Sequence, residues 1–179
     1  REGVNLTYLP FVVKAVAEAL KESPIVNSTW GGDAIILKRR VNVGVAIATP
    51  DGLVVPVVRD ADSLGVGDLA AAIDDLATRA REGKLKVADM QSGTFTINNT
   101  GALGSVTGKA IINYPQAAIL NTEAIVKRPV VIGDAIAIRS IMNLCLTFDH
   151  RIMDGAEAGA FVSGVKRRLE AIGPEGPGI

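Results

Sequence analysis

The order of hydrophobic and polar positions along the chain predicts a helix, a strand pair, a second helix, several strands and a third helix. In residues 6–24, Thr7 is placed to cap a helix, and Pro10 suits the first helical turn, where its missing N–H is not needed. The hydrophobic positions of this segment recur at helical spacing: Leu9, Val12, Val13, Val16 and Leu20. The segment is therefore predicted to be a helix with one apolar face.

Residues 41–58 are predicted to form two strands joined by a tight turn. Every second position of the first strand is hydrophobic, at Val41, Val43, Val45 and Ile47. The stretch Thr-Pro-Asp-Gly at 49–52 suits a tight turn. Because Pro56 has no backbone N–H, we expect the returning strand to lie at a sheet edge or at a bulge.

Two later segments also have the periodicity of a helix. In residues 62–85 one apolar stripe contains Leu69, Ile73, Leu76 and Ala80, and Gly83 stands where a C-terminal cap belongs. In residues 154–172 the apolar stripe contains Phe161, Val165, Leu169 and Ile172. Both segments are predicted to be helices.

Residues 93–98, 116–122, 124–133 and 134–148 are predicted to be strands. The last of these is interpreted as one long strand with Ile136, Ile138 and Ile141 among its buried positions. Hairpin-like connections between the strands favour a mixed or antiparallel sheet. The expected architecture is an α+β fold, a two-layer sandwich of a mixed β-sheet with helices on one face.

Composition narrows the class of protein. The chain has 179 residues, of which 48% are hydrophobic and only 4% aromatic, so one domain with an aliphatic core is expected. Nineteen basic residues balance nineteen acidic ones, which gives no electrostatic case for nucleic acid or an anionic membrane as a partner. The single cysteine, Cys145, cannot form an internal disulfide and lies in an apolar run, which favours a buried thiol in a reducing compartment.

The candidate catalytic residue is the only histidine, His150, which directly follows Asp149 and stands four positions before Asp154. Asp154 and Glu157 resemble a helix capping box, and Asp149 could pair with Arg151, so both carboxylates also have a purely structural interpretation. A lone histidine at such a corner is more often structural than catalytic. As a general base, His150 would need to be neutral and oriented by a partner, and either carboxylate could orient it.

Other motifs carry less chemistry. One histidine and one cysteine exclude a His-rich metal centre, and no metal is expected. The glycines of residues 100–108 lack the spacing of a dinucleotide-binding or phosphate-binding loop and indicate turns. Two Lys-Arg-Arg runs, at 38–40 and 166–168, are interpreted as solvated faces, with phosphate binding as the less favoured alternative.

Four stretches resemble one known family in its own order. "LTFDHRIMDGAEAGAFVSGVKRRLE" (146–170) resembles the Asp-His-Arg-x-x-Asp-Gly motif and helix that end the acyltransferase core of 2-oxo-acid dehydrogenase complexes, the dihydrolipoamide acyltransferase family. Residues 41–62, 92–105 and 114–131 resemble other segments of that family. The resemblance implies a fold like that of chloramphenicol acetyltransferase. It also implies trimers whose active sites lie between subunits, where coenzyme A and the dihydrolipoyl group enter from opposite ends.

The resemblance also implies roles for individual residues. His150 matches the general base that deprotonates the attacking thiol, and Asp154 matches an acidic or amide position that supports the site. Many members have a hydroxyl residue that is thought to donate to the oxyanion, but the matching residue here is Asn98. An amide can also donate, so we expect Asn98 to take this role, with Thr96 or Thr100, or low activity, as alternatives.

The resemblance extends over residues 1–179, as an acyltransferase core that lacks its first part and from which lipoyl and subunit-binding domains are absent. It implies acyl transfer between two substrates, coenzyme A and a lipoyl group carried on a separate domain. The expected partners are two further copies in a homotrimer, other trimers in a larger cage, and the decarboxylase and dihydrolipoamide dehydrogenase components. Ile179, in the apolar tail, is expected to contact a neighbouring trimer. The expected location is the cytoplasm, or the mitochondrial matrix in a eukaryote.

Two alternative functions stay open at this point. One is a cage scaffold that is weakly active or inactive, because Asn98 replaces the usual hydroxyl residue. The other is a freestanding acetyltransferase acting on a small alcohol. Acetyl, succinyl and branched-chain acyl groups are all candidates, because one methylene changes binding in a pocket by only about 1–3 kcal/mol.

Overall fold

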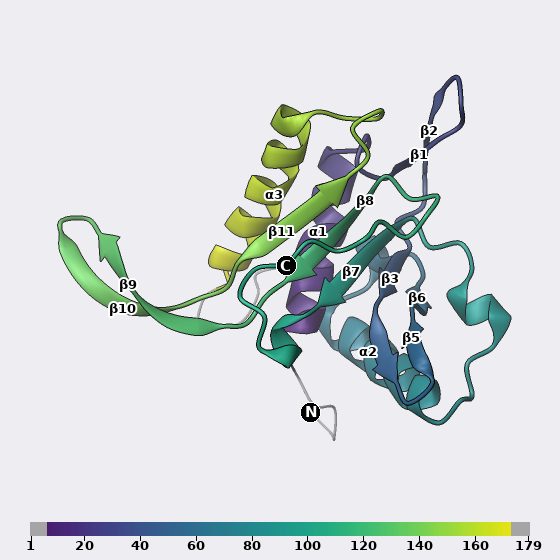
Figure 1. The fold of residues 1–179 in the computed structure, drawn as a ribbon, viewed down its shortest axis with the longest axis horizontal. Coiled ribbons are helices and arrows are strands. Elements are labelled where there is room, and N and C mark those ends of the chain that lie inside the picture. The colour runs from purple at the N-terminus through teal and green to yellow at the C-terminus, as the bar shows by residue number, and fades with distance from the viewer. Residues whose placement is uncertain (1–6, 173–179) are drawn as a thin grey trace.

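A five-stranded mixed sheet forms the centre of the computed structural model, which describes residues 7–172, and helices cover one face of the sheet (Figure 1). The strands lie in the order β11 (Leu144–Phe148), β8 (Ala118–Thr122), β7 (Phe95–Asn99), β3 (Val43–Val45) and β6 (Val57–Val58). The three central strands, β8, β7 and β3, are parallel, whereas the edge strands β11 and β6 are antiparallel to their neighbours. The predicted two-layer α+β sandwich is confirmed.

The helices are α1 (Leu9–Glu22), α2 (Val66–Arg81) and α3 (Gly155–Glu170). Their predicted apolar stripes face the core, except that Ile172 lies beyond the end of α3 and outside the core cluster. The core is aliphatic apart from an edge-to-face contact between Phe95 of β7 and Phe161 of α3, with ring centroids 5.5 Å apart. Pro10 stands in the first turn of α1 as predicted. The capping role predicted for Thr7 is wrong, because the N-cap residue is Tyr8 and no side chain caps that end.

The predicted strand pair at 41–58 is present, but each arm is interrupted. Beyond β3 and β6, a second hairpin is formed by β4 (Ile47–Thr49) and β5 (Gly52–Val54). Gly52 adopts a φ of 130°, which a side chain would strain, at the turn predicted for 49–52. Pro56 precedes the edge strand β6, so its missing N–H disrupts no ladder in the sheet interior, as predicted.

The remaining elements are short or project from the sheet. A hairpin of β1 (Ser28–Trp30) and β2 (Ile35–Leu37) follows α1, and three 3₁₀ turns lie at Ala61–Ser63, Val87–Met90 and Gly101–Leu103. Strands β9 (Val126–Ile132) and β10 (Ala135–Ile141) pair with each other along their full length and form an arm at one side of the molecule (Figure 1). No helix among residues 7–172 is long and apolar enough to cross a membrane.

The prediction of one long strand at 134–148 is wrong. The strand breaks at Asn143, whose carbonyl accepts from the N–H of Glu123 (3.1 Å) and whose amide donates to the carbonyl of Val106 (2.6 Å). The break lets β10 leave the sheet with β9. As a result Ile136 and Ile138, which were expected to be buried, are 80% and 68% exposed, and Ile141 is only half-buried.

Candidate functional site

His150 lies in the turn that joins β11 to α3, and its side chain is exposed. The turn is tied to the sheet because the N–H of Asp149 donates to the carbonyl of Ala117 (2.8 Å), just before β8 begins. The imidazole lies against the ring of Phe148, with centroids 5.6 Å apart. An exposed imidazole at the end of a strand can reach a proton on a molecule that approaches from outside the chain.

Neither neighbouring carboxylate makes a hydrogen bond to the imidazole within the described part of the chain. Asp149 instead pairs with Arg151, whose Nε and Nη2 atoms donate to its two carboxylate oxygens at 2.9 and 2.6 Å. This hydrogen-bonded pairing, more than the opposing effect of burial, lowers the pKa of Asp149 and raises that of Arg151. The guanidinium also lies over the ring of Trp30, 5.5 Å from its centroid, which attaches the His150 turn to the β1–β2 hairpin.

Asp154 forms the predicted capping box at the start of α3. Its Oδ1 atom accepts from the N–H groups of Ala156 (2.8 Å) and Glu157 (3.3 Å). In return Glu157 Oε2 accepts from the N–H of Asp154 (2.9 Å). The carboxylate thus fixes the backbone immediately after the His150 turn, so it supports the histidine through the chain and not through a direct contact.

Asn98 lies near the carboxyl end of β7, on the face of the sheet that the helices leave uncovered. Phe95 and Ile97 are buried in the core, and alternation along the strand places Thr96 and Asn98 on the opposite face. Asn98 is half-buried and is one of the residues around a cleft of about 640 Å³ at this end of the sheet, whose walls also include Tyr8 and Ile73 of α2. A cleft of this size and mixed lining is suited to a small-molecule substrate.

The two alternative donors predicted near Asn98 are already engaged. The hydroxyl of Thr96 donates to Oε1 of Gln116 (2.6 Å), and it is almost fully buried. The hydroxyl of Thr100 donates to Oε2 of Glu123 (2.8 Å). A hydroxyl has a single hydrogen to donate, so Asn98 remains the better placed donor of the three.

Glu123 is a buried carboxylate that sequence analysis missed. It accepts hydrogen bonds from Thr100 and from Nδ2 of Asn121 (3.0 Å), and it holds the loop that follows β7. Burial acts to raise the pKa of Glu123, but hydrogen bonds from Thr100, Ser105, Asn121 and the N–H of Gly108 outweigh it and lower that pKa. The available signal was a charged residue directly after a predicted strand.

Gly101 is required where this loop passes Glu123. A Cβ atom at Gly101 would lie only 2.3 Å from the backbone carbon of Glu123 and 2.6 Å from the nitrogen of Ala124. The glycines of the 100–108 segment therefore serve close packing and turns, as the sequence indicated, and the loop is fixed relative to Asn98.

The sheet register places Asn98 and His150 at opposite ends of the molecule's central sheet. Asn98 is level with Asn121 of β8, which is in turn level with Cys145 of β11. The His150 turn is instead level with Ala117, at the other end of β8. Four residues of strand separate Ala117 from Asn121, which is about 13 Å at 3.3 Å per residue. Within one chain, these two side chains cannot act on the same atom.

Metal ligation has no support among residues 7–172, where no three His, Cys, Asp or Glu side chains are grouped to hold an ion. The sheet register decides how the predicted site residues are grouped. The structure brings His150 and Asp154 together at one turn and places Asn98 at a separate cleft. Ile179 lies outside the described residues.

Comparison with known proteins identifies the fold and then the family of this chain. Chloramphenicol acetyltransferase superposes with a TM-score of 0.55 at 16% identity, over 90% of this chain and 77% of that one, which shows a shared fold. The family described as "2-oxoacid dehydrogenases acyltransferase (catalytic domain)" matches residues 1–175. The chain therefore belongs to the acyltransferase family of 2-oxo-acid dehydrogenase complexes.

Relatives whose names refer to three different acyl groups match nearly the whole chain. The lipoamide acyltransferase component of the branched-chain alpha-keto acid dehydrogenase complex of Bacillus subtilis is 55% identical over 96% of this chain and 41% of its own length. The acetyltransferase component of the pyruvate dehydrogenase complex of Corynebacterium glutamicum is 49% identical over 98% of this chain and 27% of its own length. The succinyltransferase component of the 2-oxoglutarate dehydrogenase complex of Bartonella vinsonii is 49% identical over 95% of this chain and 41% of its own length. The chain thus spans less than half the length of these relatives.

Solved structures agree closely with this fold. A probable dihydrolipoamide acetyltransferase from Listeria monocytogenes has a TM-score of 0.95 and 54% identity, over 97% of this chain and 74% of that one. The dihydrolipoamide acetyltransferase of Azotobacter vinelandii has a TM-score of 0.92 and 40% identity, over 95% of this chain and 71% of that one. That enzyme was studied for the role of a serine, a histidine and an asparagine in its catalytic mechanism.

Proposed function

We propose that this chain is a catalytic core that transfers an acyl group between a lipoyl thioester and coenzyme A. The observation that carries the proposal is a shared spacing. In the Azotobacter vinelandii enzyme the serine, the histidine and the asparagine stand 52 and then 4 positions apart. In this chain Asn98, His150 and Asp154 have the same two separations, 52 and 4.

The residues at these positions support thiol-to-thioester chemistry. His150 takes the proton of the attacking thiol, which ionises with a pKa near ~8.5 and so demands only a modest base. The thiolate forms a bond to the thioester carbonyl carbon, and the resulting oxyanion accepts a hydrogen bond from Nδ2 of Asn98. When the intermediate collapses, the original carbon–sulfur bond breaks and the departing sulfur recovers the proton from the imidazolium. Asp154 keeps the His150 turn in place through the capping box.

The active site is shared by two copies of the chain. Asn98 and His150 lie at opposite ends of the sheet in one copy, so the His150 turn of one copy must approach the Asn98 cleft of the next. His150 is exposed and the cleft is open, as such an arrangement requires. A ring of three copies would repeat this contact and close on itself.

Self-association is further supported by the β9–β10 arm. Val131, Ile132, Ile136 and Ile138 are all at least half exposed, and such a group of aliphatic side chains is typical of an interface. A solved cubic core of a pyruvate dehydrogenase complex is 41% identical to this chain, with a TM-score of 0.92. The proposed assembly is therefore a cage of trimers. Its proposed partners are the decarboxylase and dihydrolipoamide dehydrogenase components.

The test is acyl transfer from an acyl-coenzyme A to dihydrolipoamide, followed as thioester formation. His150→Ala is expected to lower kcat by about 10²–10⁴-fold with oligomer size unchanged, because the variant removes the general base. Equal, slow rates for both proteins would favour the scaffold alternative. Transfer to a small alcohol but not to dihydrolipoamide would favour the freestanding acetyltransferase. Acetyl, succinyl and branched-chain donors compared in the same assay identify the acyl group.

A further inference from the structure

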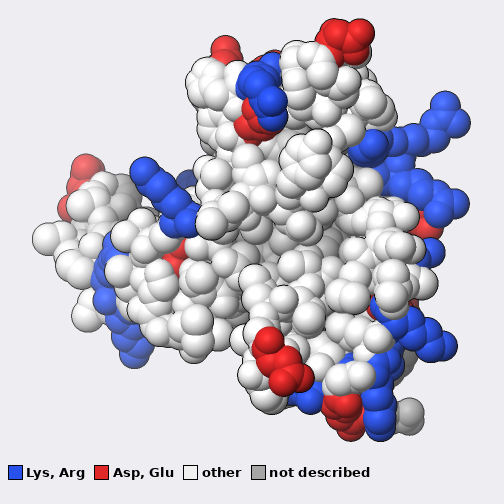
Figure 2. Space-filling view, turned by 45° about the vertical axis from the view of Figure 1, so that its right-hand side comes forward, with Lys and Arg blue, Asp and Glu red and all other residues white. Residues whose placement is uncertain are grey.

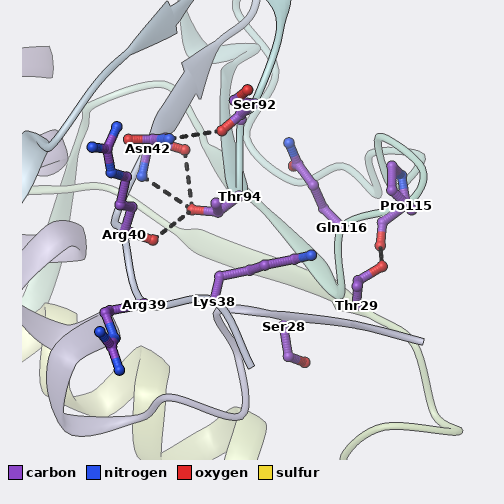
Figure 3. Close-up of a pocket in the computed structure, with 11 residues that line it drawn as sticks. Ser28, Thr29, Lys38, Arg39, Arg40, Asn42, Ser92, Thr94, Pro115 and Gln116 are labelled. Atoms are coloured by element: carbon purple, nitrogen blue, oxygen red, sulfur yellow. Dashed lines mark hydrogen bonds between the residues drawn. The ribbon is translucent and has the colours of Figure 1, made fainter. Parts of the chain in front are cut away.

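A second cavity, of about 500 Å³, lies at the opposite end of the sheet from the Asn98 cleft. Its walls come from β1, the segment between β2 and β3, and the segments that precede β7 and β8 (Figure 3). The strands β3, β7 and β8 are parallel and all begin here, so the cavity shares no lining residue with the Asn98 cleft. No step of the acyl transfer described above uses a residue that lines this cavity.

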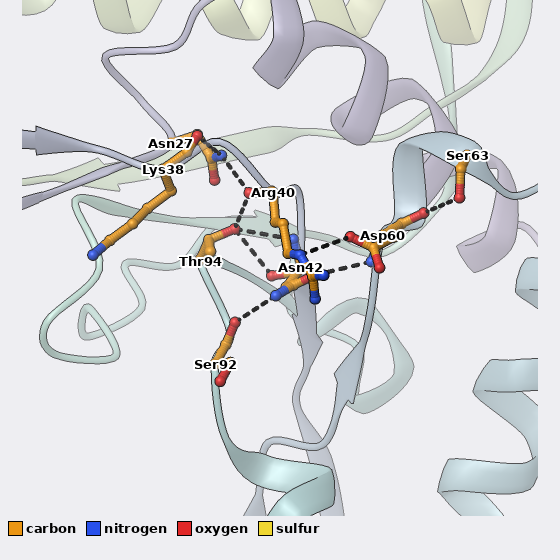
Figure 4. Close-up of polar contacts among 8 residues, drawn as sticks. All are labelled: Asn27, Lys38, Arg40, Asn42, Asp60, Ser63, Ser92 and Thr94. Carbon is orange, nitrogen blue, oxygen red and sulfur yellow. Dashed lines mark hydrogen bonds and ion pairs between the residues drawn. The ribbon is translucent and has the colours of Figure 1, made fainter.

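The floor of the cavity is built by polar groups that satisfy one another (Figure 4). Asn42 donates from its backbone N–H to Oγ1 of Thr94 (3.0 Å) and from Nδ2 to the carbonyl of Ser92 (2.8 Å). Its Oδ1 accepts from the N–H of Asp60 (2.9 Å). Both Asn42 and Thr94 are buried. The floor is therefore formed before any ligand arrives, which keeps the cost of ordering it out of the binding step.

Two hydrogen-bond donors in the cavity are left over. Gln116 is only 8% exposed, and its Oε1 is used by Thr96, but its Nε2 has no partner among the described residues. The ammonium of Lys38 has neither a hydrogen bond nor an ion pair there, and Figure 3 shows this side chain extended across the cavity toward Gln116 and Thr29. A Cβ atom on Gly93 would come within 3.1 Å of Gln116 Nε2, so the glycine keeps room beside this amide.

The charge of the lining has a single sign. Lys38, Arg39 and Arg40 all line the cavity, and none of its lining residues is acidic. The nearest compensation is a loose pairing of Arg40 Nε with Asp60 at 3.8 Å. The whole chain has no net charge, yet basic side chains gather along the right-hand edge of the face drawn in Figure 2, with others at its left and top. A cavity with such a lining attracts an anion.

The geometry points to a binding site for the phosphate group of a small phosphorylated molecule, held by Lys38 and Gln116 with Arg39 and Arg40 supplying positive potential. A phosphate monoester offers a double negative charge and several acceptor oxygens, which match an ammonium and an amide that have hydrogens to donate. A volume of about 500 Å³ exceeds what a phosphate group alone fills, so the remainder of the ligand also fits inside.

Calorimetric titration with inorganic phosphate and with glycerol phosphate tests this site, and the chain supplies a matched control. Lys38→Ala is expected to weaken phosphate binding about tenfold to a hundredfold, since a charge-assisted hydrogen bond is lost. Lys166 begins the second Lys-Arg-Arg run, pairs with Glu170 and lies on α3, so Lys166→Ala is expected to leave the affinity unchanged. Equal losses in both variants, or no binding by the unaltered protein at millimolar phosphate, would overturn the inference.

A second variant tests the amide. Gln116→Glu keeps an acceptor for Thr96 but places a carboxylate in the cavity, so phosphate binding should be abolished while the melting temperature stays close to that of the unaltered protein. Unchanged phosphate affinity in a folded Gln116→Glu variant contradicts the site. Tighter binding of succinate than of glycerol phosphate would also contradict it, because the ligand would then be a carboxylate.

A comparison of coenzyme A with its 3′-dephospho form separates two sources of the phosphate. If removal of that phosphate weakens binding in the unaltered protein but not in Lys38→Ala, the phosphate belongs to coenzyme A. If both forms bind equally and inorganic phosphate still depends on Lys38, the ligand is a different phosphorylated molecule. Each outcome supports a phosphate site. Binding of coenzyme A, its dephospho form and phosphate that is the same with and without Lys38 contradicts it.

Discussion

Asn98 and His150 lie at opposite ends of one sheet, about 13 Å apart along the direction of the strands. The two side chains belong to the same proposed reaction, in which one donates to the oxyanion and the other takes the thiol proton. Their separation means that a single chain holds two half-sites. A complete site requires that two copies meet.

Complementation between two inactive variants tests the shared site. His150→Ala and Asn98→Leu are each expected to be inactive, but co-refolding them should restore activity, because about a quarter of the interfaces in a random mixture join an intact His150 to an intact Asn98. Acyl transfer is measured before and after co-refolding. Activity that never rises above the sum of the separate proteins would mean that the site is not shared.

Replacement of Asn98 tests the oxyanion donor. Asn98→Ala should lower kcat by about 10²–10³-fold with little change in KM, because the donor acts on charge that develops in the transition state. Asn98→Ser should recover part of the rate, since a hydroxyl can donate in its place. If Asn98→Ala keeps full turnover with the oligomer intact, the donor lies elsewhere.

Asp154 is expected to act through the helix cap. Asp154→Asn retains a capping oxygen and should keep both stability and turnover close to those of the unaltered protein. Asp154→Ala removes it and should lower the free energy of unfolding by about 1 kcal/mol, with a loss of kcat as the His150 turn loosens. Urea denaturation and the acyl-transfer assay measure the two effects. A large loss of kcat in Asp154→Asn at unchanged stability would instead show that the negative charge itself is needed.

Glu123 should make stability depend on pH. Its pKa is lowered in the folded protein, so its contribution is complete above the unfolded value, near ~4.3, and declines as the pH falls through the lower folded value. Glu123→Gln should therefore be less stable by about 1–3 kcal/mol at pH 7, with a difference that narrows toward pH 3. Urea denaturation across this range measures it. Glu170→Gln, at an exposed ion pair, is the control and should show little difference at either pH.

The β9–β10 arm is expected to be needed for assembly. A charge at Ile136 or Ile138 should reduce the oligomer to smaller species, because a carboxylate buried in an apolar contact is costly. Sedimentation velocity of Ile136→Glu and Ile138→Glu measures particle size. Val87→Glu, which changes another exposed aliphatic residue on a different segment, should leave the particle size unchanged. Unchanged size in the arm variants would place the interface elsewhere.

Much of the fold was predictable because it rests on local interactions. The helices at 9–22, 66–81 and 155–170 follow from apolar periodicity, and the capping box joins residues only three positions apart. The ion pair of Asp149 with Arg151 is equally local. The cap predicted at Thr7 rests on the same local grounds, but Tyr8 occupies the N-cap position, since a local pattern places a helix end only to within one or two residues.

The sequence by itself determined the elements, the aliphatic core and the position of His150 at the end of a strand before a capped helix. Only the tertiary structure decided that Asn143 breaks the last strand, that Ile136 and Ile138 are exposed on an arm, and that Thr96 and Thr100 are already engaged. It also decided that Asn98 and His150 stand at opposite ends of the sheet. The physical reason is that these features depend on strand register and on hydrogen-bond partners about 20 or more positions away, which hydrophobic periodicity does not encode.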